Sequence, residues 1–82
     1  GDKALFQHWA ALTVASQIRA NPQAQGIPEE QIIQIAQQQS STVVNSLLQQ
    51  GLLKEEGAQY VALVSLKDLE LKVNDKPMPL PI

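Results

Sequence analysis

Residues 59–75 read QYVALVSLKDLELKVND, and the spacing of apolar side chains along this stretch decides the predicted fold. Apolar residues recur at every second position, which is the period of a β-strand, first at Tyr60, Ala62, Val64 and Leu66 and again at Leu69, Leu71 and Val73. With Lys67-Asp68 as the turn, the register brings the apolar residues of both segments onto one continuous face. The pattern therefore predicts an antiparallel β-hairpin with strands at about 59–66 and 69–75.

The turn and the end of this hairpin are less sharply specified. Lys-Asp is an uncommon pair for a tight type I′ turn, so a four-residue loop remains an alternative. Asn74-Asp75 is a second turn signal, and the three prolines among residues 76–82 each lack an amide donor. We therefore expect a short proline-rich edge segment, in which Met78 and Leu80 lay apolar side chains on the hairpin or on another part of a larger sheet.

Two helices are predicted upstream of the hairpin. The first spans about residues 3–20, which contain no glycine or proline. The second spans about residues 28–50, because Pro28 suits the first helical position and Gly51 suits the left-handed residue after the helix. Its apolar residues cluster on one face, the expected core: Ile32, Ile33, Ala36, Val43, Val44, Leu47 and Leu48. The predicted class is α+β, a two-helix hairpin followed by a β-hairpin in one domain, residues 1–82.

The first helix spreads its apolar residues around its circumference. Leu5, Trp9 and Leu12 form one stripe, whereas Val14 and Ile18 fall on nearly the opposite side. This distribution favours a helix that lies between the second helix and the sheet. An intermolecular contact along the stripe is the alternative.

The second helix carries an uncharged outer face. No charged residue occurs from Gln31 through Gln50. The outward positions, here called the amide face, are Gln34, Gln38, Ser41, Asn45 and Gln49. Glutamine is a good helix former that keeps an exposed helix face hydrated without charge, so simple solvent exposure is one explanation of this face. The other is a packing surface, because uncharged amides are desolvated at lower cost than lysine or glutamate.

The composition bounds the possible functions. The chain has 82 residues, a net charge of −2 and no cysteine, which excludes disulfides, thiolate zinc sites and cysteine nucleophiles. A slightly negative chain lacks the positive field that non-specific nucleic-acid binding requires, and for the same reason we expect no direct membrane contact by this segment. No stretch reaches the 18 or more apolar residues of a membrane span.

The candidate catalytic groups do not form a recognisable site. His8 is the single histidine, and its helical neighbours Ala11 and Leu12 can neither orient it nor share a metal. The serines and threonine at residues 40–42 have no base nearby in sequence. The glutamate pairs 29–30 and 55–56 are adjacent residues, which on a helix point about 100° apart. We predict no catalytic, cofactor-binding or metal site, and no enzyme.

The order of helix, helix and hairpin is also that of a winged helix, which is the alternative function considered. A helix that reads DNA directs arginine or lysine toward phosphates and bases, whereas residues 31–50 contain neither. We therefore expect no nucleic acid among the partners.

The sequence from Leu47 to Leu80 resembles the carboxyl end of the YdgA-like bacterial family, a domain of unknown function (945). In that family, helices lead through a Gly-Leu step into a strand with a tyrosine, then into a strand ending Asn-Gly-Lys and a Pro-Leu tail. The matching residues are Gly51, Leu52, Tyr60, Asn74, Lys76, Pro79 and Leu80. Asp68 and Asp75 depart from the pattern, since glycines are expected there, and this weakens the match of the turns.

The resemblance implies a longer parent protein with an amino-terminal anchor in the inner membrane and a body in the bacterial periplasm. This chain would be its carboxyl-terminal part. The family pattern supplies no catalytic residues, so the resemblance implies a structural or protein-interaction module. The expected partners are the remainder of the parent, another protein, or a second copy of the chain.

Overall fold

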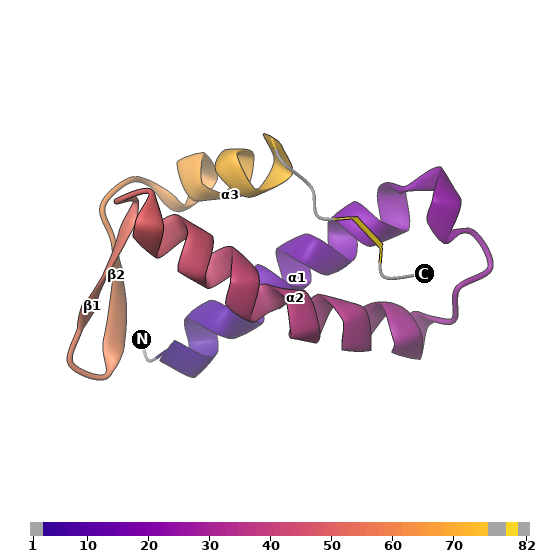
Figure 1. Cartoon of the computed structure of the whole chain (residues 1–82), viewed down its shortest axis with the longest axis horizontal. Helices are drawn as coiled ribbons and strands as arrows, with labels where there is room; N and C mark the ends of the chain where they lie inside the picture. Colours follow the sequence, from indigo (N-terminus) through magenta and orange to yellow (C-terminus); the bar gives the residue numbers. More distant parts are fainter. Residues whose placement is uncertain (1–2, 76–78, 81–82) are drawn as a thin grey trace.

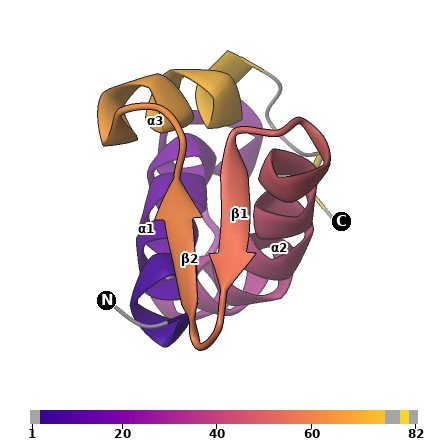
Figure 2. The same cartoon turned by 90° about the vertical axis from the view of Figure 1, so that its left-hand side faces the viewer.

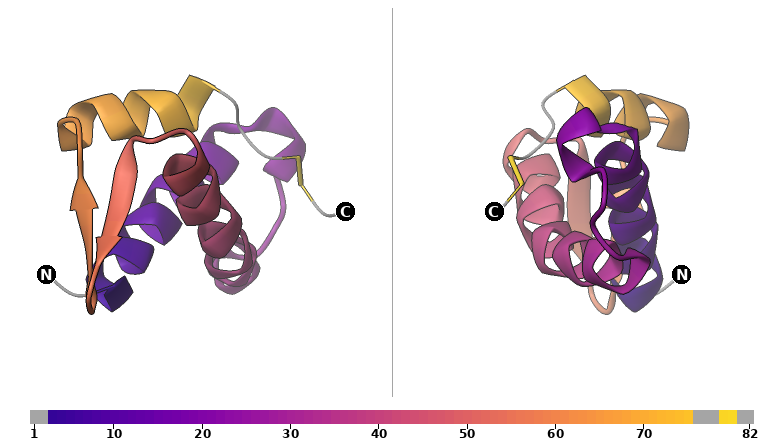
Figure 3. Two further views of the ribbon diagram at one scale, coloured as in Figure 1. Left: turned by 60° about the vertical axis from the view of Figure 1, so that its left-hand side comes forward. Right: turned by 90° about the vertical axis from the view of Figure 1, so that its right-hand side faces the viewer.

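The computed structural model describes residues 3–75 and 79–80 (Figure 1). The elements in chain order are helix α1 (Lys3–Ala20), the short 3-10 helix η1 (Pro22–Ala24), helix α2 (Glu29–Gln49), strand β1 (Leu53–Glu56), strand β2 (Gln59–Ala62) and helix α3 (Leu66–Asp75). The α+β class is confirmed: helices dominate, and the first two precede an antiparallel hairpin. α1 and α2 cross each other obliquely while running in roughly opposite directions, and the two strands lie at one end of the pair (Figures 1 and 3).

The loop between α1 and α2 is ordered by local hydrogen bonds. Asn21 begins η1, and its side-chain oxygen accepts a hydrogen bond from the backbone N–H of Gln23 at 2.9 Å. Gly26 then adopts a φ of +87°, which is readily available only to glycine. Both helices begin and end within one residue of the predicted bounds.

The end of α2 is a Schellman cap centred on Gly51, the residue predicted to be left-handed. Gly51 has a φ of +75° and donates to the carbonyl of Leu48 at 3.2 Å. Leu52 donates to the carbonyl of Leu47 at 3.1 Å, which completes the two hydrogen bonds of the motif. The cap reverses the chain, so that β1 starts at once and returns along the end of the helical pair.

The β-hairpin lies earlier in the chain than predicted. β1 occupies residues 53–56, where no strand was predicted, and Leu53 pairs with Ala62. Gly57, with a φ of +59°, takes the first central position of the two-residue turn, where a type II′ turn requires glycine. Leu53 is buried, so the side of the sheet that carries Leu53, Glu55 and Tyr60 faces the helices (Figure 2).

The predicted strand at 69–75 is wrong, because residues 66–75 form helix α3. Its start is set by Ser65, whose hydroxyl oxygen accepts a hydrogen bond from the backbone N–H of Asp68 at 3.1 Å. Asp68 in the first turn and Lys72 in the last turn both complement the helix dipole. The predicted strand at 59–66 is accordingly cut to 59–62, and the proposed turn at Lys67-Asp68 lies inside the helix.

A single core lies between the three helices and the hairpin. Its largest fully buried side chains are Leu47, Leu69, Val14 and Val44. Ile33, predicted in the core, is exposed, whereas Ile35 and Gln39 are buried. Gln39 donates its side-chain amide to the carbonyl of Pro79 at 3.1 Å, so the tail covers that side of α2 and shifts the buried face toward it.

The tail and the first helix also depart from the expectations. Leu80 packs against the core cluster and not on the hairpin, whereas Met78 lies outside the described residues. The core side of α1 is formed by Ala10, Val14, Ala15 and Ile18. Leu12 stays 54% exposed, because the two strands lie beside the amino-terminal turns of α1 (Figure 1).

Candidate functional site

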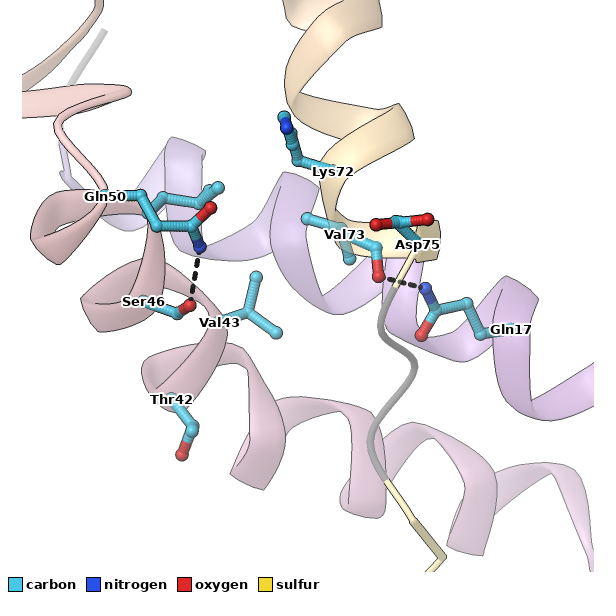
Figure 4. Close-up of a pocket in the computed structure, with 9 residues that line it drawn as sticks. Gln17, Thr42, Val43, Ser46, Gln50, Lys72, Val73 and Asp75 are labelled. Atoms are coloured by element: carbon cyan, nitrogen blue, oxygen red, sulfur yellow. Dashed lines mark hydrogen bonds between the residues drawn. The ribbon is translucent and has the colours of Figure 1, made fainter.

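A pocket of about 270 Å³ lies where α1, α2 and α3 meet (Figure 4). It is lined by Gln17, Thr42, Val43, Ser46, Leu47, Gln50, Lys72, Val73 and Asp75. α1 supplies the glutamine at 17, α2 supplies residues 42–50, and α3 supplies residues 72–75. The sequence did not indicate this pocket, because three segments far apart in the chain form it and one of them was assigned to a strand.

Two hydrogen bonds join groups that line the pocket, and a third connects Gln17 to the neighbouring Asn74. The Gln17 side-chain nitrogen donates to the carbonyl of Val73 at 2.9 Å and to Oδ1 of Asn74 at 2.8 Å. Gln50 donates to the Ser46 hydroxyl oxygen at 2.9 Å. These bonds hold α3 against α1 and fix the end of α2. No histidine lines the pocket, so neither of its hydroxyl side chains, Thr42 and Ser46, has an imidazole base in the lining.

The residues considered as catalytic candidates are dispersed. His8 is exposed on α1, and the glutamates at 29–30 are exposed at the start of α2. Glu55 and Glu56 lie on β1, where each carboxylate pairs with a lysine, Lys3 for the first and Lys54 for the second. Among residues 3–75 and 79–80, no three histidine, aspartate or glutamate side chains gather in a group that could hold a metal ion.

The amide face is the clearest surface feature that the sequence anticipated. All five of its side chains are exposed along α2: Gln34, Gln38, Ser41, Asn45 and Gln49. Thr42 and Ser46, which line the pocket, lie on the same helix and are also exposed. A polar surface without charge therefore runs along the helix to the mouth of the pocket.

A second feature is an aromatic cluster where the hairpin meets α1. The Phe6 ring lies 5.2 Å from Trp9 and 5.8 Å from Tyr60 between centroids, the latter edge to face. The ammonium of Lys3 lies 5.2 Å from the centre of the Tyr60 ring and 2.6 Å from a carboxylate oxygen of Glu55. The three rings are only partly buried, so one side of the cluster stays open to solvent.

Three ion pairs neutralise part of the surface charge. Lys3, Arg19 and Lys54, three of the six basic residues of the chain, form ion pairs with glutamates. The hydrogen bond to Glu55 raises the pKa of Lys3 above its usual value. The hydrogen bond to Glu29 likewise raises the pKa of Arg19, so the pair joins the end of α1 to the start of α2.

The Arg19–Glu29 pair predicts a pH dependence at the acidic end. The hydrogen bond from Arg19 holds the pKa of the Glu29 carboxyl below its usual value, so its stabilising effect is present near neutral pH. That effect is lost as the pH falls through the lowered pKa. We expect Glu29→Gln to melt at a lower temperature than the parent at pH 7, and the difference to shrink steadily as the pH falls below the usual pKa of a glutamate carboxyl. A difference that does not change with pH across the acidic range would show that the carboxylate charge is not responsible.

Comparison with known proteins connects the chain to one family. A family profile described as "Bacterial protein of unknown function (DUF945)" matches residues 1–81. No curated protein and no solved structure matches the chain. None of the described helices combines the length and the apolar character needed to cross a membrane.

Proposed function

The chain belongs to the DUF945 family of bacterial proteins of unknown function, and on that premise we propose that it is a non-enzymatic structural and protein-interaction module. In this proposal the module acts through its surface. It packs against the remainder of a longer parent protein or against another protein.

The exposed amide face of α2 is the observation that supports this proposal. Stable interfaces are depleted of charged residues at their centre, because desolvating a charge costs more than desolvating an amide. Gln38 and Asn45 lie seven positions apart on one side of the helix, and both are exposed. Lysine and glutamate would make a solvent-exposed helix face more soluble, but neither occurs in residues 31–50.

Exposed apolar side chains add to this support. Leu63 and Leu66, in and beside the connection from β2 to α3, are 52% and 56% exposed, and Leu71 on α3 is 58% exposed. A single exposed leucine is ordinary on a protein surface. Several exposed leucines in so small a domain support a surface that a neighbouring protein covers.

We also propose a place for the module in the cell. The motifs of residues 47–80 support a carboxyl-terminal position in a longer protein that is anchored in the inner membrane and faces the periplasm. Fractionation of bacteria that express the tagged full-length protein tests this. Recovery in the soluble cytoplasmic fraction would reject the envelope location.

Nucleic acid is not among the proposed partners. The amide face carries no basic side chain, residues 31–50 contain no lysine or arginine, and the net charge of the chain is −2. A winged-helix function would require salt-dependent affinity for duplex DNA, which an electrophoretic assay at low salt measures.

The interaction proposal is tested by charging the amide face. We expect the isolated chain to bind the separately expressed remainder of the full-length protein, and Gln38→Lys with Asn45→Lys to weaken that binding at least tenfold. The control is Gln25→Lys, an exposed glutamine in the loop between the helices. Circular dichroism verifies that each variant is folded. A chain that sediments as a strict monomer and binds nothing from the remainder would count against the proposal.

A further inference from the structure

We propose that the outer edge of β2, the edge that faces away from β1, receives one extended, uncharged strand from a partner polypeptide. The added strand continues the two-stranded sheet over the amino-terminal half of α1. This inference rests on the proposed interaction function, and it assigns a second surface and a chemistry to the partner. It starts from the backbone hydrogen bonds of the hairpin.

The register of the hairpin determines which backbone groups of β2 point outward. The N–H of Leu63 donates to the carbonyl of Leu52 at 2.9 Å, so Leu63 directs its backbone groups toward β1. Antiparallel strands alternate, and Val61 therefore does the same, whereas Tyr60 and Ala62 direct their N–H and C=O away from β1. Two donors and two acceptors thus stand in a row along the outer edge of β2.

The two edges of the sheet differ in charge. β1 contains Lys54, Glu55 and Glu56, and charged side chains are a common means of keeping an edge strand from pairing. β2 has no such protection, because residues 57–66 include no charged residue. The strand has the composition of an interior strand but occupies an edge. Two strands alone also make a marginal sheet, which a third strand would strengthen.

α1 provides a floor for the incoming strand. Figure 2 shows α1 behind β2, and the contact of Phe6 with Tyr60 places the helix directly under this side of the sheet. Trp9 is only partly buried, and Leu12, one turn further on, is 54% exposed. Inward-facing side chains of a third strand would lie over this aromatic and aliphatic stripe, so alternate residues of that strand should be apolar.

The position of α1 also favours a single extended segment as the partner of β2 and disfavours β2 of a second copy of the chain. If β2 paired with β2 of a second copy around a two-fold axis, each copy would bring its own α1 beneath the junction. Strands pair at about 4.8 Å, whereas helix axes need about 8–10 Å. A single extended segment has no helix attached at this point and meets no such obstacle.

A peptide with the sequence of the chain's own strand serves as the probe. The peptide contains residues 58–65, AQYVALVS, which are uncharged. Both of its termini are blocked, and a dilysine tail is added for solubility. With Val61 opposite its own copy in the peptide, Tyr60 and Ala62 complete four backbone hydrogen bonds. The readout is amide hydrogen exchange of the isotope-labelled chain by NMR.

We expect the amides of Val61 and Leu63 to be protected before peptide is added, and those of Tyr60 and Ala62 to exchange rapidly. Saturating peptide should slow exchange at Tyr60 and Ala62 at least tenfold. Ala62→Pro removes one outward donor and should weaken peptide binding at least tenfold. Glu55→Pro, which removes the equivalent donor from the free edge of β1, is the matched control and should bind as the parent does.

Two results would overturn this inference. One is unchanged exchange at Tyr60 and Ala62 with millimolar peptide, and the other is concentration-dependent protection of both amides without peptide, which would assign the edge to a second copy. The exchange rates of Tyr60 and Ala62 in the wild-type chain test the inference even if the Ala62→Pro variant does not fold. If the chain binds the remainder of the full-length protein while both amides still exchange rapidly, strand addition at the β2 edge is rejected but the proposed interaction function is not.

Discussion

Leu69→Ala will lower the free energy of unfolding by about 2–5 kcal/mol, a large part of the stability of a domain this small. Leu69 is completely buried, and it is one of two buried residues through which α3 packs on the rest of the protein. Removing three carbons there sacrifices apolar burial and leaves a cavity that neighbouring helices can close only partly. Urea unfolding followed by circular dichroism measures the loss.

Leu71→Ala is the matched control, because Leu71 belongs to the same helix and is 58% exposed. We expect its effect to stay within about 0.5 kcal/mol. The pair also distinguishes the helix from the strand that the sequence suggested. In a strand, Leu69 and Leu71 would share one face and the two substitutions would have similar costs. Similar costs would therefore contradict the structure of α3.

Val44→Asp will largely unfold the chain at neutral pH. Val44 is 1% exposed in the carboxyl-terminal half of α2, and a carboxylate at this position would be buried without a partner. The cost is about 4 kcal/mol or more, which approaches the whole stability expected of the domain. Thermal and urea unfolding at pH 7 measure the effect.

The same variant should recover stability in acid. Burial raises the pKa of the introduced carboxyl in the folded state, so its neutral form is favoured, and the destabilisation shrinks as the pH falls toward 4. Asn45→Asp places the same charge one residue away on the exposed face and should change stability by less than about 0.5 kcal/mol. Equal losses for the two variants would show that Val44 is not buried.

The parts of the fold that local signals specify were predictable from the sequence. Pro28 and the glutamates after it mark the start of α2, and Gly51 marks its end, since each signal acts within one turn of the helix. The amide face followed from the same helical period. These features require no knowledge of the rest of the chain.

α3 was mistaken for a strand because its apolar residues fit two periods. Leu69, Leu71 and Val73 alternate as in a strand, but Leu69 and Val73 are also four apart and share one side of a helix. Ser65 decides between the two readings: with Asp68 three residues later, it has the spacing of a helix cap. An alternation of only seven residues is weaker evidence than a cap.

The pocket and the position of β1 depend on long-range contacts that no local pattern contains. The segment from Lys54 to Glu56 is polar, and it becomes a strand because Gly57 turns the chain and β2 supplies the hydrogen-bonding partner. The pocket requires α3 to reach Gln17, some 57 positions earlier. Such contacts follow from packing of the whole chain.

The hydrogen bonds from Gln17 to the end of α3 have a consequence for the order in which the protein folds. α1 and α2 are neighbours in sequence, so their contacts close a short loop and can form early. α3 buries Leu69 and Val73 against surfaces that exist only after the first two helices have paired. We therefore expect α3 to fold late, and to be among the first elements that a local opening of the native state releases.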